Sequence, residues 1–370
     1  MFNRQELRKF EDDFGKGFSK IFCWLASPFI DKDRLLIKGF YRKAREAADK
    51  NNFDYKQIYP RIQADLKPPK TGDPVHKLFT TKRANFPEEF VMQVPEGRVF
   101  DWEGLFILPD NMGVKDINIM GESYKTTKKL LGGESFYLSG NSLYLCTNWS
   151  NFYYHWIIDV LPKLHIFEQS GLKADNYIIN GMKHDYQRKA LEMIGIPTKK
   201  IFETKPDCNI KCENLIITSQ PGYMGFCPEW AANYIRSRLV QNISSSEPVN
   251  IYISRSRANQ RKVLNEDEVF EYLKLKGFEK VYPEDYSLKE QIKLFKSAKT
   301  IVAPHGSGLT NIVFSNPDTK VVEIFSPTYM EPCYWRLANA VNLDYYYVLG
   351  EENIENHNII LNIDKLKDIL

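Results

Sequence analysis

A regular alternation of apolar and amphipathic segments between residues 249 and 325 is the strongest constraint on the fold of this chain. Apolar runs and the amphipathic stretches between them occur in the order 249–254, 265–276, 278–282, 287–298, 300–303, 308–314 and 320–325. Parallel strands cannot be joined by tight turns, so helices must carry the chain back between them. The alternation therefore predicts a small doubly wound α/β domain in this part of the chain.

A second, less regular alternation precedes it. Strand-like runs and helix-like stretches occur at 142–146, 152–169, 177–179, 185–194 and 214–217. Shorter strand-like runs bounded by Pro, Gly or Asp occur earlier, at 89–94, 98–100 and 104–108. The strand–helix pattern again favours a parallel sheet with helical cover.

Two boundaries divide the chain. Apolar residues recur at helical spacing over 33–49, and the proline-rich segment 67–74 follows, so a helical extension is predicted over 1–74. The serine-rich segment 242–248 ends in a proline and reads as a second boundary. The predicted units are thus the extension, an acceptor domain over 75–247 and a nucleotide-sugar domain over 248–370, whose last helix could pack back on the acceptor domain.

Composition excludes several classes of protein. The chain has 370 residues and a net charge of +3, and its basic residues form no concentrated stripe, so no nucleic-acid partner is expected. No apolar run approaches the ~20 residues of a membrane span, although 21–30 is apolar with basic flanks and could lie on a membrane surface or pack as a helix. Cys208 and Cys212 have no second ligand pair at finger-like spacing, so no metal is expected. We expect a cytoplasmic protein, with peripheral contact at the inner membrane surface left open.

The segment His305-Gly306-Ser307-Gly308 follows a predicted strand and opens a predicted helix. Ligands of open α/β sheets lie beyond the carboxyl ends of the strands, and a helix N-terminus there attracts phosphate. The segment matches neither the dinucleotide fingerprint nor the P-loop. It is either a phosphate-binding turn or a tight structural turn.

Three charged residues lie at neighbouring strand ends. Arg255 ends the first strand of the domain and Arg261 follows it, so their guanidinium groups could grip a diphosphate. Glu323 is an unusual residue for a buried strand, and it could accept hydrogen bonds from a ribose or face solvent at a sheet edge.

His155 and Asp159 are four residues apart on a predicted helix, so they can share one face and form a hydrogen bond. A carboxylate that orients an imidazole fixes its tautomer and raises its basicity, as a general base requires. A histidine packed in the core is the alternative.

Four blocks together resemble glycosyltransferase family 61. They read Asn-x6-His-Trp-x2-Asp-x-Leu-Pro-x-Leu, Ser-Arg-x5-Arg-x3-Asn-Glu-x-Glu-Val, Gln-Ile-x-Leu-Phe-x-Ser-Ala and His-Gly-Ser-Gly-Leu-Thr-Asn-Ile-Val-Phe, within roughly 143–325. The family includes plant xylan transferases, eukaryotic O-linked N-acetylglucosamine transferases and bacterial capsule-type enzymes. The resemblance implies a GT-B fold, in which two Rossmann-like domains face each other across a cleft, and inverting transfer without a metal.

The resemblance also implies a set of site residues. The donor diphosphate and ribose would contact Arg255, Arg261, His305, Gly306, Ser307, Gly308, Leu309, Asn311 and Glu323. Across the cleft, His155 or Asp159 would deprotonate the acceptor, with Asn148 and Trp156 binding it.

The expected function is transfer of a sugar from a nucleotide-diphosphate donor, with UDP the expected nucleotide, to a glycan hydroxyl in surface or capsular polysaccharide synthesis. The donor is a substrate and no further cofactor is expected. A lipid-linked acceptor and the oligomeric state are left open. The alternatives are a nucleotide-sugar epimerase, which needs no acceptor, and a non-catalytic glycan-binding or assembly protein.

Overall fold

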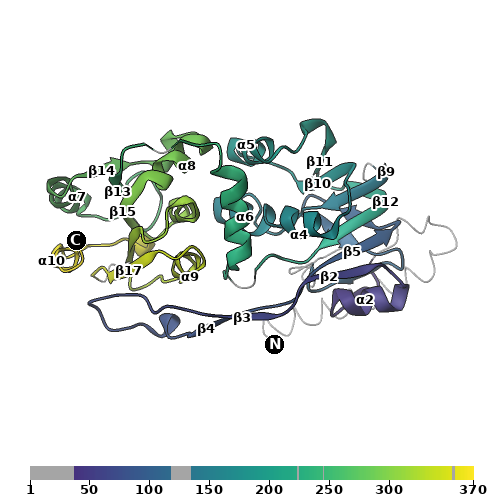
Figure 1. Cartoon of the computed structure of the whole chain (residues 1–370), viewed down its shortest axis with the longest axis horizontal. Coiled ribbons are helices and arrows are strands. Elements are labelled where there is room, and N and C mark those ends of the chain that lie inside the picture. Colours follow the sequence, from purple (N-terminus) through teal and green to yellow (C-terminus); the bar gives the residue numbers. More distant parts are fainter. Residues whose placement is uncertain (1–36, 118–134, 223–224, 245, 352–354) are drawn as a thin grey trace, which may run out of the picture.

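The computed structural model describes residues 37–117, 135–222, 225–244, 246–351 and 355–370. Over these residues the chain is a mixed α/β structure with one sheet of eight strands and one of five. Figure 1 shows the sheets in separate halves of the molecule, with helix α6 (Glu229–Leu239) between them. Among the described helices, none is long and apolar enough to cross a membrane. The apolar run at 21–30 lies outside the described residues.

The N-terminal half contains most of the strands. Its first elements are β1 (Gly39–Tyr41), α2 (Ala44–Asn51), β2 (Tyr55–Tyr59), β3 (Ile62–Asp65), η2 (Lys77–Phe79), β4 (Arg83–Phe86), β5 (Glu89–Pro95), β6 (Arg98–Phe100), β7 (Leu105–Ile107) and β8 (Met112–Val114). They are followed by β9 (Ser135–Tyr144), α3 (Tyr153–His155), η5 (Trp156–Val160), α4 (Lys163–Ser170), β10 (Asn176–Asn180), α5 (Asp185–Ile194), η6 (Thr198–Lys200), β11 (Ile201–Thr204), β12 (Asn209–Thr218) and α6.

The eight-stranded sheet is mixed rather than parallel, which corrects the prediction for this half. Its order is β11-β10-β9-β12-β5-β2, and β6 pairs with both β12 and β7. The strands from β11 to β12 are parallel, as predicted, but β5 and β6 run antiparallel to β12. Strands β5, β6 and β7 are joined by connections too short for a crossover helix. Short connections of this kind favour antiparallel pairing.

The C-terminal half follows the predicted alternation. Its elements are β13 (Val249–Ile253), α7 (Glu266–Leu275), β14 (Phe278–Val281), η7 (Pro283–Asp285), α8 (Leu288–Ser297), β15 (Ala298–Pro304), η8 (Ser307–Phe314), β16 (Lys320–Phe325), α9 (Cys333–Ala340), β17 (Asp344–Leu349), η9 (Glu355–His357) and α10 (Asp364–Lys367). The strands are all parallel and stand in the order β14-β13-β15-β16-β17. The strand order reverses between β13 and β15, and doubly wound sheets bind ligands at such a switch point.

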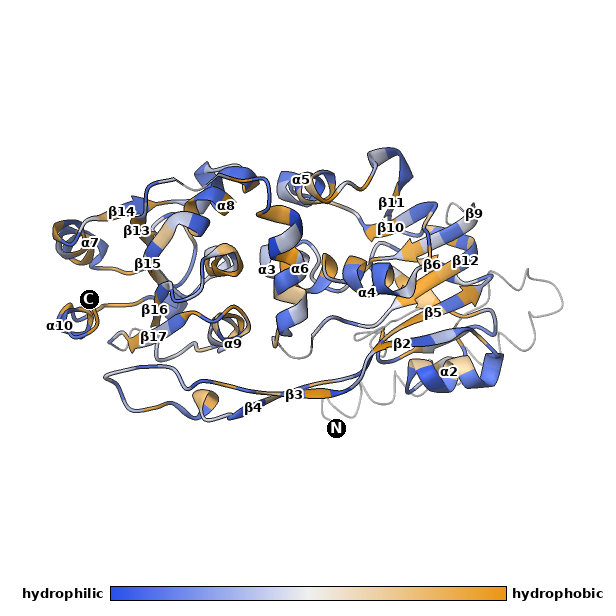
Figure 2. Ribbon diagram, viewed as in Figure 1, coloured by the Kyte–Doolittle hydropathy of each residue, from blue (hydrophilic) through white to orange (hydrophobic). Residues whose placement is uncertain are grey.

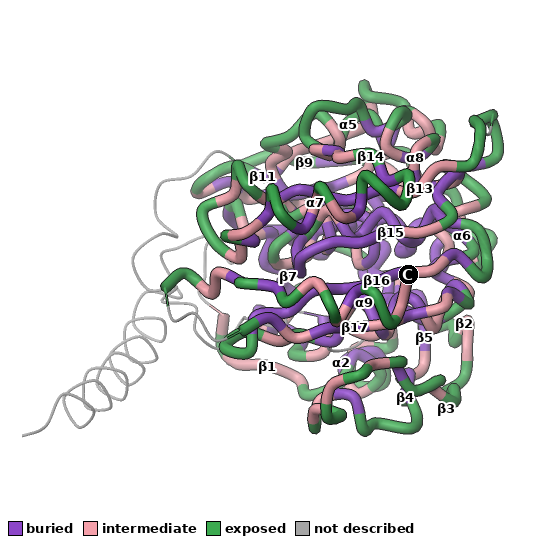
Figure 3. Tube along the Cα trace, turned by 90° about the vertical axis from the view of Figure 1, so that its left-hand side faces the viewer, coloured by how far each residue is buried: buried purple, intermediate pink, exposed green. Residues whose placement is uncertain are grey.

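Two layers of side chains cover the five-stranded sheet. One face packs on α7 and on α10, so the apolar side of the last helix lies against the C-terminal sheet. The other face joins α8, η8 and α9 to α6 and η5 in a single apolar cluster that runs through both halves. In Figure 2 the central strands are largely apolar and α2 and α5 carry polar surfaces, while Figure 3 shows β15 and β16 buried along most of their length.

The predicted helical extension contains strands in its described part. The helix is limited to Ala44–Asn51, and Gly39–Tyr41 forms strand β1, which pairs with β8. Residues 1–36 lie outside the described part of the chain. Strand β2 lies at the edge of the eight-stranded sheet, where it pairs antiparallel with β5.

The proline-rich segment predicted as a linker forms a strap that crosses to the other half. The ribbon leading into it from β3 and out of it to β4 runs along the lower side of the molecule in Figure 1. Lys70 N donates to Tyr345 O and Lys70 O accepts from Tyr347 N, both at 3.0 Å, so the strap pairs with the outer edge of β17. The ring of Phe79 stacks on that of Tyr347 at 4.5 Å between centroids. The strap therefore covers a sheet edge and ties the two halves together.

Candidate functional site

The switch point brings together two backbone turns. Arg255 follows β13 and Gly306 follows β15, and these two strands are neighbours in the sheet. The Arg255 guanidinium lies so close to Gly306 that a Cβ atom there would come 2.0 Å from its Nη1. The φ of Gly306 is 173°, an extended value that any residue can adopt. The glycine is therefore required by the arginine and not by the backbone conformation.

Arg255 and Arg261 form a cationic pair without a carboxylate partner among the described residues. Arg255 Nη2 donates to Gln260 O at 3.2 Å, and the Arg261 guanidinium lies 4.7 Å above the ring of Tyr329. The Nε atoms of both arginines are buried and have no hydrogen-bond partner in the described structure. Burial, with a further contribution from Arg261, lowers the pKa of Arg255 from its usual value. Two neighbouring guanidinium groups that are partly shielded from water can together bind an anion.

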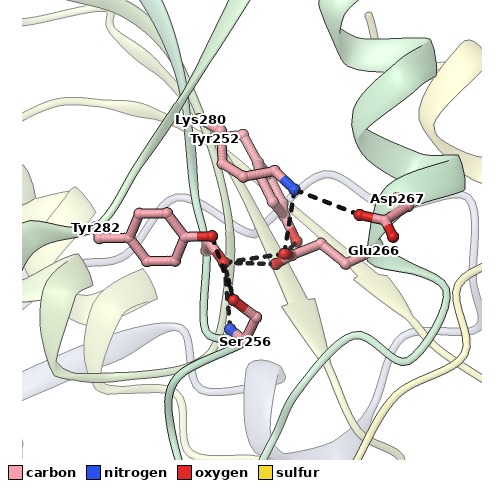
Figure 4. A network of polar contacts seen from close by, with 7 residues as sticks. Tyr252, Ser256, Glu266, Asp267, Lys280 and Tyr282 are labelled. Carbon is pink, nitrogen blue, oxygen red and sulfur yellow. Dashed lines mark hydrogen bonds and ion pairs between the residues drawn. The ribbon is translucent and has the colours of Figure 1, made fainter.

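A polar network, drawn in Figure 4, fixes the turn that carries Arg255. Ser254 Oγ donates to Glu266 at 2.8 and 3.0 Å, and Tyr252 donates to the same carboxylate at 3.0 Å. Lys280 approaches Glu266 at 3.3 Å. Glu266 is buried at the first turn of α7, where the helix dipole stabilises its negative charge. It was not predicted as a site residue, although it lies in the Asn-Glu part of the second sequence block.

The His305 ring and Glu323 form a buried pair. His305 Nδ1 lies 2.5 Å from Glu323 Oε1, and Tyr345 donates to the other oxygen of the same carboxylate. Glu323 has no exposed surface. It therefore orients His305 in this structure, and direct contact between Glu323 and a ribose stays a prediction that would require one of its partners to move.

The other residues of the turn face in two directions. Ser307 is exposed and Gly308 is partly exposed, and the first turn of η8 leaves their N–H groups without an intrahelical acceptor. Leu309 lies in the core. Asn311 is buried, accepts a hydrogen bond from Tyr153 at 2.6 Å and donates one to Gln291 at 2.9 Å. The predicted donor contacts of Leu309 and Asn311 do not fit this burial, because their side chains hold the two halves together.

His155 and Asp159 are brought together as predicted. His155 Nδ1 lies 2.6 Å from Asp159 Oδ2, and 29% and 28% of their side chains are exposed. The predicted long helix is divided into α3, a π-helical turn at η5 and α4, which begins after Pro162. Proline lacks the N–H that a continuous helix would use, and π turns are frequent at functional sites.

The surroundings of His155 are aromatic. The ring of Trp149 lies 5.2 Å from the imidazole and that of Tyr154 lies 5.4 Å away. A line of rings continues from Tyr154 to Tyr334 at 5.9 Å and from Tyr334 to His305 at 5.2 Å. The His155 pair and the arginine site are thus separated by two packed tyrosines.

Of the two residues predicted to bind the acceptor, Asn148 is partly exposed beside this cluster. Trp156 has no exposed surface and packs in the core, so its predicted acceptor contact does not fit the structure. Apolar spacing alone could not distinguish an aromatic ring that faces the core from one that faces the site.

Lys163 is a buried cation that was not predicted. Its Nζ donates to Cys146 O at 2.8 Å, just beyond the carboxyl end of β9. Burial lowers the pKa of Lys163 to about 8, against an opposing effect of Asp159. Its position between Leu161 and Leu164, on the apolar face of α4, was the available indication in the sequence.

Comparison with known proteins finds similarity to a glycosyltransferase family. Residues 153–322, from α3 to β16, match the Glycosyltransferase 61 family, so the resemblance to this family is confirmed over the segment that joins the two candidate sites. A rice protein (Oryza sativa subsp. japonica) named beta-1,2-xylosyltransferase RCN11 is 36% identical over 62 residues, and an Arabidopsis thaliana beta-1,2-xylosyltransferase is 35% identical over 60 residues. These matches cover 17% and 16% of this chain, and the chain spans 12% and 11% of the lengths of those relatives.

Proposed function

We propose that this chain is an inverting, metal-independent glycosyltransferase of the GT-B type, which moves a sugar from a nucleotide-diphosphate donor to a glycan hydroxyl. The observation that carries the proposal is the pair Arg255 and Arg261, which have no carboxylate partner in the described structure and lie at the switch point of a doubly wound sheet. The match to the Glycosyltransferase 61 family supports it. In this assignment 75–247 form the acceptor domain and 248–370 the donor domain.

On the donor side, the diphosphate would lie against the two guanidinium groups and the first N–H groups of η8. Arg255 lies against Gly306, and the N–H groups of Ser307 and Gly308 belong to the first turn of η8, where they have no intrahelical acceptor. These donors would stabilise the negative charge that grows on the leaving nucleotide, a role that a metal ion plays in other transferases. Glu323 would act through His305, whose orientation it fixes.

On the acceptor side, His155 would act as the general base. Its Nδ1 is engaged by Asp159, which leaves Nε2 to take the proton of an acceptor hydroxyl. The resulting alkoxide would attack the anomeric carbon in line with the departing diphosphate. One carbon–oxygen bond forms as the other breaks, so a single displacement inverts the anomeric configuration.

We infer that the donor is UDP-linked and that the sugar is a pentose or hexose. The matched relatives named beta-1,2-xylosyltransferase favour a pentose. Surface or capsular polysaccharide synthesis on the cytoplasmic side of a membrane, with an oligosaccharide or lipid-linked acceptor, is the context we propose. The N-terminal extension, residues 1–74, is the candidate for peripheral membrane contact.

The purified chain should be incubated with UDP-xylose, UDP-glucose, UDP-galactose or UDP-N-acetylglucosamine, each with and without a mixture of oligosaccharide acceptors, and with EDTA in parallel. We expect UDP release and a glycosylated product that require both substrates and persist in EDTA. Conversion of the donor without an acceptor would favour the epimerase. Donor binding without any product would favour a non-catalytic glycan-binding protein.

A further inference from the structure

Two large aromatic side chains stand exposed on the turn that leads into α3. Trp149 is 53% exposed and Phe152 is 63% exposed. Rings of this size usually bury their apolar faces, and exposed pairs of them often mark a binding surface. Both rings belong to the chain segment that immediately precedes His155.

The backbone beneath the two rings is held firmly by the protein. Phe152 N donates to Trp149 O at 2.7 Å, and two side chains of α5 donate hydrogen bonds to the same turn. The buried Gln187 donates to Ser150 O at 3.1 Å, and the Tyr186 hydroxyl donates to Asn151 O at 2.8 Å. The rings are therefore carried on a fixed support and are not the exposed ends of a loose loop.

Trp149 adopts a backbone conformation that a bulky residue rarely takes. Its φ is +60°, in the left-handed region that glycine and asparagine adopt with less strain. A glycine at this position would relieve the strain and would expose less apolar surface. Neither folding nor solubility accounts for a tryptophan at this position, which leaves a role in binding.

The position of Trp149 beside the proposed base indicates what it binds. Its ring lies 5.2 Å from the imidazole of His155, at an angle of 40°, and His155 is partly exposed. A lipid chain or an apolar protein surface on the tryptophan would desolvate the His155–Asp159 pair without offering it polar partners. A ligand here must cover the apolar ring of Trp149 and also offer polar partners to the His155–Asp159 pair. A pyranose ring does both, because one of its faces presents C–H groups to the aromatic ring and its edge presents hydroxyls.

We propose that Trp149 and Phe152 form a platform on which a pyranose ring of the acceptor stacks, with one of its hydroxyls directed toward His155 Nε2. The identification of this sugar as the acceptor rests on the proposed glycosyltransferase function. The binding of a neutral pyranose at Trp149 can be tested independently of that function.

Saturation-transfer NMR on the full chain would use four probes, the methyl β-pyranosides of xylose, glucose, galactose and mannose. We expect transfer to the C–H protons of at least one sugar, with a signal at least ~10-fold weaker in Trp149→Gly and largely kept in Trp149→Phe. The melting temperature of Trp149→Gly should equal or exceed that of the wild type, because the substitution relieves strain. Tyr137→Ala, which removes another exposed ring of the same half, is the matched control and should change nothing.

Two results would overturn the proposal: a Trp149→Gly signal equal to that of the wild type, or no saturation transfer from the wild type to any of the four sugars. Thermal shift with UDP in the same variants reports on the donor site and should be unchanged. If the wild type bound a pyranoside through Trp149 but neither bound UDP nor formed product, the platform would stand and the glycosyltransferase function would fail. Once an acceptor is known, Trp149→Gly should raise its KM far more than it lowers kcat.

Discussion

The charged side chains of the two proposed sites differ in whether they have partners within the protein. At the edge of the C-terminal sheet, Arg255 and Arg261 are partly desolvated and have no carboxylate partner in the described structure. In the N-terminal half, His155 is paired with Asp159 and Lys163 is satisfied by a backbone carbonyl. A site that binds an anion leaves its cations unpaired, whereas a site that moves a proton pairs its groups internally. The difference agrees with the proposed division between donor binding in the C-terminal half and acid–base chemistry in the N-terminal half.

Removal of the proposed base should have the largest effect on turnover. His155→Ala is expected to lower kcat by ~1,000-fold, within the 10²–10⁴ range of general base catalysis, and Asp159→Asn should cost less because the imidazole remains. UDP binding, measured by calorimetry, should not change in either variant. If donor binding fell together with kcat in His155→Ala, the two halves would not divide the labour in this way.

Removal of the principal cation should have the next largest effect. Arg255→Ala is expected to lower turnover by ~100-fold, as for the loss of one donor to a developing oxyanion, and also to weaken UDP binding. Arg257→Ala is the matched control, because Arg257 pairs with Asp285 at 2.6 Å and lies over the ring of Tyr282. Steady-state kinetics should show a large loss of turnover in Arg255→Ala and little loss in Arg257→Ala. Equal losses of turnover in the two variants would contradict the proposed role of Arg255.

Much of the donor side could be predicted from the sequence, because it depends on local order. Strands that alternate with helices must place Arg255 and Gly306 at one sheet edge, whatever the details of packing. The pairing of His155 with Asp159 was also local, since it follows from a spacing of four residues. The features that sequence could not supply are tertiary: the burial of Glu323 against Tyr345, and the use of Asn311 to hold Tyr153 across the two halves.

The same distinction explains the corrected elements. Trp156 lies in an apolar run in which either face could have been the buried one, and its burial depends on the apolar cluster that runs through both halves. The antiparallel strand β5 and the strap before β4 depend on partners far along the chain. Periodicity predicts an element, but it carries no information about the distant partners that decide which of two apolar faces is buried.

A smaller effect is expected from a single methyl group beside Arg255. In Gly306→Ala the new Cβ would lie 2.0 Å from Arg255 Nη1 and would push the guanidinium away, so we expect UDP binding to weaken by ~10-fold. Gly72→Ala, whose Cβ would meet no atom within 4 Å, controls for the substitution itself. Calorimetry with UDP distinguishes the two. If Gly306→Ala bound UDP as the wild type does, the close approach of Arg255 would have no part in donor binding.

The smallest effect on turnover is expected at Glu89, a buried acidic group of the N-terminal half. Glu89 is buried at the start of β5, with Ser219 at 2.5 Å from one oxygen and no partner in the described structure for the other. Burial raises its pKa to about 8. The folded protein therefore keeps a proton that the unfolded chain releases above its ordinary pKa near 4.5, so Glu89 makes stability fall as pH rises from about 4.5 to about 8.

Replacement of Glu89 by glutamine should remove this part of the pH dependence while leaving kcat within about twofold of the wild type, because the residue touches neither proposed site. Urea unfolding at pH 5, 6.5 and 8 should show the wild type losing up to ~1.4 kcal/mol per pH unit relative to Glu89→Gln. Lys163 does not obscure the comparison between pH 5 and 8. Its pKa is lowered from 10.5 to about 8, so its own effect, a stability that rises with pH, falls between about pH 8 and 10.5. If the free energy of unfolding changed with pH equally in the two proteins, Glu89 would be ionised in the folded state. A nearby cation of the N-terminal half would then have to compensate its charge.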